Sequence, residues 1–250
     1  MLAKTRWLGA TNNDSLLWVA TNKLMWWRRL HKPDVQVSTR LCGNSVRHAW
    51  PVILDLLGAD AVVYTFGIGR DASFEQELID TVGCKVYSFD PTPKSIAWLK
   101  GQNFGPNFHF GEIGISDADG TMELAPPLKE GHISYSAYLP TSTERPPLQV
   151  RACTLPTIMG ELGHVRLDLL KMDIEGCEYR VIDHLEASGL RPPQMLIEFH
   201  QGFYGCSKQM TLESVTKVNR MGYEIFWVSD RGLEYGFVHK AALNRLARDG

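Results

Sequence analysis

The sequence predicts an α/β fold, in which a doubly wound, mostly parallel sheet carries helices on both faces. Three observations predict this fold. Short apolar or β-branched runs alternate with helical patterns from residue 61 to residue 222. A glycine-rich turn, Gly67 to Ala72, directly joins the first such run to the first helical pattern. An acidic residue, Asp90, follows Gly69 by 21 residues at the end of the next run.

Residues 1–60 are expected to form a helical extension that packs on an α/β domain spanning residues 61–250. The stretch Leu16 to Trp27 reads as an amphipathic helix, for which a membrane-surface role is the alternative. Ser45 to Leu57 has helical apolar spacing, with Pro51 at a break or a new first turn and Gly58 as its stop.

The first unit of the domain combines the strand Ala61 to Phe66 with a helix over residues 73–82. Between them, Gly67 lets the chain turn sharply and Gly69 lets the backbone approach a ligand. The second strand, Lys85 to Phe89, ends at Asp90. At this spacing an acidic residue can accept hydrogen bonds from ribose hydroxyls, although Asp90 could also cap the helix over residues 94–100.

The middle of the chain predicts a third strand, Phe108 to Ile115, bent between Gly111 and Gly114. A short strand over residues 121–124 follows. Residues 125–147 are rich in Pro, Ser, Thr and Tyr, and we interpret them as a loop over the site. A strand over residues 150–155 and a short helix over residues 156–162 complete this part.

A buried strand, Leu167 to Met172, stops at Asp173, and Glu175 and Gly176 follow at once. A helix is expected over residues 177–190, then a strand over 195–199, with Glu198 inside it and His200 just past its end. A helix over 211–221 precedes a final strand pair over 223–228 and 233–238, which can be antiparallel. The carboxyl ends of parallel strands share one edge of the sheet, so we expect Asp90, Asp173 and His200 to gather there.

These residues define the predicted chemistry. His200 is the expected general base, because an unperturbed imidazole has a pKa near 6.5 and can accept a proton at neutral pH. Asp173 or Glu175 could instead take that proton or orient the molecule that gives it up. The alternatives are helix capping by the two carboxylates and a structural role for His200. No metal ligand is assigned, although Asp173, Glu198 and His200 leave a divalent ion open as an alternative.

Composition narrows the classes of partner and compartment. A formal net charge of -2 over 250 residues gives no reason to expect a nucleic-acid partner. Five scattered cysteines without a CxxC pair favour a reducing, cytoplasmic setting. We expect no integral membrane segment, while an anchor upstream of Met1 stays open. Trp7, Trp18, Trp26 and Trp27 fit either the core or an oligomer interface.

Five segments resemble the FkbM-type family of S-adenosylmethionine-dependent methyltransferases. They are VYTFGIGRDASFE (63–75), VYSFDPTPKS (86–95), GEIGISDADGTMEL (111–124), LLKMDIEGCEYRVI (169–182) and MLIEFH (195–200). The resemblance implies a Rossmann-like sheet of seven strands with the last strand antiparallel. It also implies a cofactor site, with Gly67 and Gly69 at the methionine part of S-adenosylmethionine and Asp90 on the ribose. Phe66 and Pro91 adjoin these residues, Glu112 and Ile113 flank the adenine, and Asp173 lies near the sulfonium.

The expected reaction is methylation of a hydroxyl on a sugar or another small molecule. One departure from the pattern is that no acidic residue precedes Gly67, so Asp71 or Glu75 would have to hold the cofactor's amino group. This departure leaves open a methyltransferase-like binding module without catalysis. An NAD-dependent dehydrogenase is the other alternative, because the glycine turn and Asp90 would serve NAD too, but no Tyr-x-x-x-Lys pair stands in the usual region and the Asp173–Gly176 turn has no role in such an enzyme.

Overall fold

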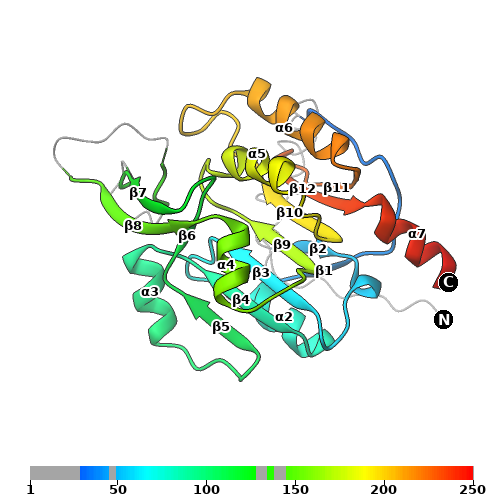
Figure 1. Cartoon of the computed structure of the whole chain (residues 1–250), viewed down its shortest axis with the longest axis horizontal. Coiled ribbons are helices and arrows are strands. Elements are labelled where there is room, and N and C mark those ends of the chain that lie inside the picture. Colours follow the sequence, from blue (N-terminus) through cyan, green and yellow to red (C-terminus); the bar gives the residue numbers. More distant parts are fainter. Residues whose placement is uncertain (1–28, 45–48, 128–133, 138–144, 250) are drawn as a thin grey trace, which may run out of the picture.

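The computed structural model describes residues 29–44, 49–127, 134–137 and 145–249, and its centre is a seven-stranded sheet (Figure 1). In spatial order the strands are β11 (Tyr223–Val228), β12 (Glu234–His239), β10 (Gln194–Glu198), β9 (Leu169–Met172), β3 (Val62–Phe66), β4 (Lys85–Phe89) and β5 (Phe108–Gly111). β12 runs antiparallel to β10 and β11, and the other neighbours are parallel. The predicted doubly wound sheet with an antiparallel last strand is therefore confirmed.

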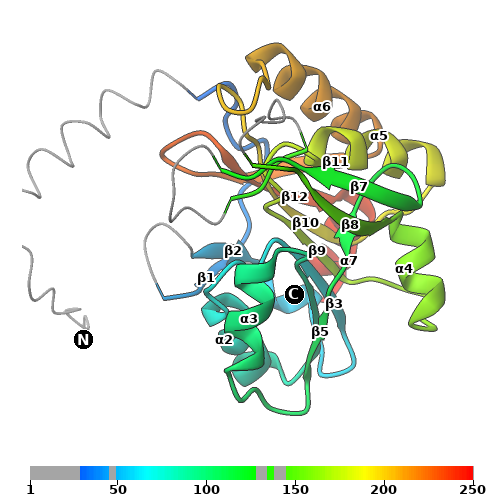
Figure 2. The same cartoon turned by 90° about the vertical axis from the view of Figure 1, so that its left-hand side faces the viewer.

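The central strands are apolar on both faces, and each face has its own core. On one face, Tyr64 and Leu170 are fully buried beneath α4 (Leu155–Glu161), α5 (Glu178–Ser188) and α6 (Lys208–Arg220). On the other face, Val63 and Leu169 pack against α2 (Ser73–Val82) and α7 (Lys240–Asp249). Figure 2 shows α2 beside α3 (Pro93–Lys100), on the side of the sheet away from α5 and α6. Burial on both faces explains why these strands are continuous apolar runs.

Residues 29–44 and 49–53 do not form the helical extension that the sequence predicted. They form an antiparallel pair, β1 (Arg40–Cys42) and β2 (Trp50–Val52), followed by a 3-10 helix over Leu54–Leu56. Residues 50–53 are all buried, whereas a helix lying on a surface buries only one stripe of its residues. β2 pairs with β1 alone, so Pro51 lies in an edge strand, where its missing N–H is tolerated.

The predicted helix over residues 16–27 and the four N-terminal tryptophans lie outside the described residues. β1 and β2 pack on α2 and the central sheet through Cys42, Trp50 and Val52. A domain boundary at residue 60 stays a prediction.

A second sheet of three strands was not predicted. It contains β6 (Gly114–Ile115), β8 (Leu148–Cys153) and β7 (Gly120–Leu124), in that order, and projects to the left of the large sheet in Figure 1. The expected third strand therefore breaks after Gly111, and its two halves belong to different sheets. In β8, exposed and buried residues alternate up to Ala152, as expected of a sheet with one solvated face.

The helix α7 was also missed, because the sequence prediction ended with the strand pair. Ala242 of α7 is buried, and Leu243 and Leu246 are partly buried against the α2 face of the sheet. These three residues form one apolar stripe on an otherwise polar helix, a pattern that the sequence prediction overlooked.

Candidate active site

A cavity of about 380 Å³ opens at the carboxyl ends of β3, β4 and β9. Such an edge is where ligands bind in open α/β sheets. The predicted site residues that line it are Phe66, Gly67, Gly69, Asp90, Pro91, Ile113, Asp173 and Glu175. Glu112 and His200 do not line it.

The glycine turn brings the ends of β3 and β9 into close contact. Gly67 has a φ of 82°, and a Cβ atom there would lie 1.7 Å from the carbonyl oxygen of Asp173. The backbone N–H of Asp173 donates to the carbonyl of Phe66 over 3.0 Å, and that of Gly67 donates to Phe89 over 3.0 Å. Only glycine fits at position 67, and its presence fixes Asp173 at the cavity wall.

Asp90 both lines the cavity and holds the two loops beside it. Its Oδ2 accepts a hydrogen bond from the backbone N–H of Gly69 (3.0 Å). Its Oδ1 accepts from the backbone N–H of Thr92 (2.8 Å) and from the Thr92 hydroxyl (2.6 Å). Thr92 is the N-cap residue of α3, and Asp90 accepts from Thr92 rather than from an N–H of the helix, so the structure does not support Asp90 as the cap.

Glu112 lies outside the cavity, contrary to its predicted place beside the adenine. Its carboxylate pairs with Lys100 of α3 over 2.7 Å and is half exposed. Ile113 lines the cavity, because these neighbouring side chains point in different directions after β5 ends. The small sheet adds Met122 and Leu124 to the wall, and Ser134 and Tyr135 also line it. The sequence predicted the strand that carries Met122 and Leu124 but gave no signal for where it packs.

The two candidates for holding the cofactor's amino group differ in position. Asp71 lines the cavity, and its Oδ1 accepts a hydrogen bond from the backbone N–H of Ser73 (2.9 Å). Glu75 is 1% exposed and does not line the cavity. The structure thus leaves Asp71 as the carboxylate within reach of a bound ligand.

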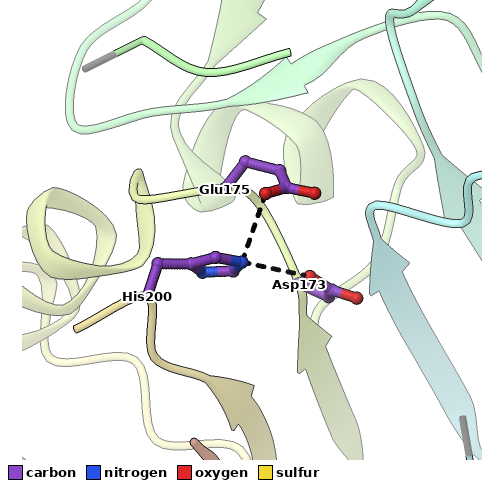
Figure 3. Close-up of side chains that lie close together, drawn as sticks. All are labelled: Asp173, Glu175 and His200. Atoms are coloured by element: carbon purple, nitrogen blue, oxygen red, sulfur yellow. Dashed lines mark ion pairs between the residues drawn. The ribbon is translucent and has the colours of Figure 1, made fainter. Parts of the chain in front are cut away.

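His200 lies behind the cavity, among three carboxylates. Its Nε2 is 3.3 Å from Oε2 of Glu175 and 3.7 Å from Oδ1 of Asp173. Figure 3 shows both carboxylates on the side of the ring that carries this nitrogen. Its Nδ1 is 3.0 Å from Oε1 of Glu178, which also accepts the backbone N–H of His200 over 2.9 Å. Glu178 is fully buried and was not among the predicted site residues, although it belongs to the same sequence motif as Asp173.

The sequence placed Glu198 beside Asp173 and His200, but its carboxylate is not among the ligand atoms that converge there. Burial and the nearby charge of Asp173 raise the pKa of Glu198 to about 9. Its carboxylate pairs with Arg231 over 2.8 Å, and Arg231 also pairs with Glu234. Glu175 takes its place, because the turn after β9 carries Glu175 back toward the end of β10. Glu175 has a φ of 54°, an uncommon backbone conformation that Gly176 (φ 106°) follows.

The three carboxylates change the expected charge of His200. Burial by itself would lower the pKa of His200, but the hydrogen bonds to Glu175 and Glu178 and the charge of Asp173 raise it to about 12. Burial raises the pKa of Asp173, and the charges of Lys171 and His200 offset part of this effect. These hydrogen bonds and charges favour the protonated imidazole, so the structure does not support the unperturbed pKa on which the general-base role of His200 was predicted.

Comparison with known proteins is consistent with this arrangement. The family model for the methyltransferase FkbM domain matches residues 67–225. The probable methyltransferase-like protein 24 of Homo sapiens is 25% identical over 169 residues, which cover 67% of this chain and 38% of that protein. The protein of the same name from Rattus norvegicus gives the same values. The chain thus spans 38% of the length of these curated relatives.

Solved structures that align with part of this chain include the methyltransferase FkbM of Methylobacillus flagellatus KT. It is 15% identical, with a TM-score of 0.48 over 73% of this chain and 44% of that one. The fibrillarin of Aeropyrum pernix, solved with natively bound S-adenosyl-L-methionine, is 14% identical, with a TM-score of 0.40 over 74% and 69% of the two chains.

Among the described residues, no helix has both the length and the apolar character needed to span a bilayer. The domain match covers most of the chain and includes the glycine turn, Asp90, Asp173 and His200. It confirms the predicted resemblance, and with it S-adenosylmethionine as the cofactor. This chain belongs to the FkbM methyltransferase family.

Proposed function

We propose that the chain transfers a methyl group from S-adenosylmethionine to a hydroxyl of a sugar or another small molecule. The observation that carries this proposal is the cavity at the carboxyl ends of β3, β4 and β9, with Gly67, Asp90 and Asp173 on its wall. Its volume, about 380 Å³, is within the range of small-molecule sites.

Each part of the cofactor has a matching part of the wall in this proposal. Gly67 and Gly69 lie at the methionine part, Asp90 accepts hydrogen bonds from the ribose, and Ile113 packs on the adenine. Asp71 is the proposed partner of the amino group, since it lines the cavity beside the glycine turn.

The reaction is an in-line displacement, in which the acceptor oxygen, the methyl carbon and the sulfur must be aligned. Asp173 is placed for this task, because its side chain lies on the cavity wall and also close to His200. We assign to Asp173 the positioning of the acceptor hydroxyl and the uptake of its proton. Glu175, also on the wall, orients the acceptor, and His200 acts from behind as a positioning residue.

A hydroxyl acceptor fits the chemistry of this wall better than a polyanion does. Four carboxylates line the cavity against one cation, Arg70, so the wall repels phosphate groups on balance, and the formal net charge of the chain is -2. Ser134 and Tyr135 add hydroxyl groups on the same wall, which can exchange hydrogen bonds with a sugar.

The test is calorimetric titration with S-adenosylhomocysteine, with NAD as the control ligand. We expect micromolar binding of S-adenosylhomocysteine and none of NAD. The substitution Ile113→Gln should weaken binding by about tenfold through lost apolar contact, whereas Glu112→Gln on the neighbouring residue should leave it unchanged.

A panel of sugars and other hydroxyl compounds, assayed with labelled S-adenosylmethionine, then tests transfer. Methylation of an oxygen in any of them would support the proposal. Cofactor binding without transfer to any member would favour the binding module, and binding of NAD would favour the dehydrogenase.

A further inference from the structure

Three ligand atoms converge beside the cavity from the ends of two neighbouring parallel strands. Nε2 of His200, after β10, faces Oδ1 of Asp173 and Oε2 of Glu175, which follow β9 (Figure 3). The three ligand atoms lie within 4.8 Å of one another. One imidazole nitrogen and two carboxylates form a donor set that binds divalent ions in proteins.

The ring of His200 is oriented from behind as metal-bound histidines are. Oε1 of Glu178 lies 3.0 Å from Nδ1, so Nδ1 carries a hydrogen that it donates to Glu178 and Nε2 faces the other two carboxylates. The other oxygen of Glu178 accepts the backbone N–H of Gly176 over 2.9 Å. A carboxylate that holds the far nitrogen of a ligating imidazole is the usual outer support of such sites.

The charges of the group also call for a cation. Asp173, Glu175 and Glu178 face one imidazole, and Glu178 and His200 are buried. The charge of Lys171 reaches Asp173, but its ammonium packs 5.0 Å from the ring centroid of Trp50, on the α2 face of the sheet. Negative charge in excess at a largely buried site is costly unless a bound proton or a cation compensates it, and a divalent cation would compensate two charges at once.

The group formed by Asp173, Glu175 and His200 is also accessible from the cavity. Asp173 and Glu175 line the cavity, whereas His200 lies behind them, so the open side of the three-residue group faces the space proposed for the acceptor. The Tyr204 hydroxyl donates to Oε2 of Glu175 and fixes that carboxylate in place. A cation held here would therefore be reachable by an oxygen of a bound molecule.

We propose that Asp173, Glu175 and His200 bind a divalent cation of the Mn²⁺ or Mg²⁺ class, with Glu178 holding His200 in its ligating orientation. The ion takes the position of the hydrogen between Nε2 and Glu175.

The role of this ion in catalysis rests on the proposed function, whereas its binding does not. In that role the ion lowers the pKa of the acceptor hydroxyl, and a free oxygen of Asp173 takes the proton. The acceptor oxygen then bonds to the methyl carbon, while the carbon–sulfur bond breaks and its electron pair stays on S-adenosylhomocysteine.

The experiment is titration of the chelator-treated full chain with Mn²⁺, followed by the loss of the free aqueous Mn²⁺ signal in electron paramagnetic resonance. We expect one site in the wild type. His200→Ala should abolish it, and Glu178→Gln should weaken it by about 10- to 100-fold. Glu175→Gln should also weaken Mn²⁺ binding by at least tenfold. Because the Glu175 side chain is partly exposed, this variant tests the site if the buried substitution His200→Ala impairs folding.

Glu186→Gln is the matched control, because Glu186 of α5 pairs with Arg220 of α6 and does not line the cavity. We expect its Mn²⁺ affinity to stay within threefold of the wild type. A folded wild type that binds no Mn²⁺ at millimolar concentration would overturn the proposal, as would unchanged affinity in folded His200→Ala and Glu175→Gln. S-adenosylhomocysteine is titrated into the same samples. Binding of it without Mn²⁺ binding refutes the metal site alone, and Mn²⁺ binding without it refutes the proposed function alone.

Discussion

At the scale of single residues, Asp90 shows how one side chain can serve both the fold and the ligand. Its two oxygens already accept three hydrogen bonds, from Gly69 and Thr92, and the residue is 5% exposed. A carboxylate oxygen can accept more than one hydrogen bond, so a bound ribose need not displace these partners. Removal of the whole carboxylate would therefore disturb the loops as well as the ligand.

The substitution Asp90→Asn keeps part of the loop contacts and removes the charge. Its amide oxygen can still accept from Thr92, whereas its NH2 group cannot accept from the Gly69 N–H, and no charged acceptor is left for the ribose. We expect S-adenosylhomocysteine binding to weaken by about tenfold or more, since a hydrogen bond to a charged group contributes about 1.5–3 kcal/mol. Calorimetry measures the affinity, and urea unfolding checks the fold. Asp80→Asn, on the exposed side of α2, is the control, and unchanged affinity in a folded Asp90→Asn protein would refute the ribose assignment.

At the scale of secondary-structure elements, the contact between the ends of β3 and β9 positions the site. Gly67 leaves β3 with a positive φ and passes the carbonyl of Asp173 at a distance that excludes any side chain. The sequence predicted a sharp turn and an approach to a ligand at the two glycines. The structure shows that the closest approach of Gly67 is to the neighbouring strand end.

Replacement of this glycine tests the contact. Gly67→Ala should lower the free energy of unfolding by about 3 kcal/mol or more, because backbone strain adds to a clash with the Asp173 carbonyl. Gly160→Ala is the matched control, since no heavy atom lies within 4 Å of its added Cβ in α4. It should raise stability by about 0.5–1 kcal/mol. Urea denaturation measures both, and equal stabilities would contradict the close contact.

At the scale of the whole molecule, the α2 face of the sheet contains two buried charged residues. Glu75 of α2 is 1% exposed, and neither of its carboxylate oxygens has a hydrogen-bond partner among the described residues. Lys171 of β9 is 5% exposed and lies 5.8 Å from the ring centroid of Phe74. Burial raises the pKa of Glu75, and the charge of Lys171 offsets part of this rise.

This raised pKa predicts how stability depends on pH. The folded protein binds the Glu75 proton more tightly than the unfolded chain does, so its contribution to stability falls as pH rises above about 4.5. Glu75→Gln removes that fall, and the variant should gain stability relative to the wild type, by up to about 1.4 kcal/mol per pH unit. Urea unfolding between pH 4 and pH 7 measures this difference.

Glu77, on the same helix, provides a control whose pKa is shifted in the opposite direction. The backbone N–H of Gly43 donates to its carboxylate, which lowers the pKa of Glu77, so its contribution to stability is present above about pH 4.5 and is lost in acid. Glu77→Gln should therefore lose stability relative to the wild type as pH rises. Stability curves that stay parallel for wild type and Glu75→Gln would contradict the raised pKa.

Local signals in the sequence were sufficient for the sheet and for the glycine turn. The bounds predicted for α2 and β4 coincide with those observed, because apolar periodicity, Gly83 and Asp90 mark them within a few residues. The buried runs before Asp173 and His200 likewise predicted strands that end at one edge of the sheet. These features depend on the order of residues along a single element, which is what a sequence pattern records.

Only the tertiary structure decided which side chains meet at the site. Glu175 rather than Glu198 approaches His200, because the backbone at Glu175 turns the chain back while Glu198 is held by Arg231. Glu178 reaches the far side of the imidazole, and this set of carboxylates gives His200 a pKa far from its unperturbed value. The three-stranded sheet and the β1–β2 pair were not predicted from the sequence for the same reason. Pairing and charge contact depend on distances between residues remote in the chain, and no local pattern fixes those distances.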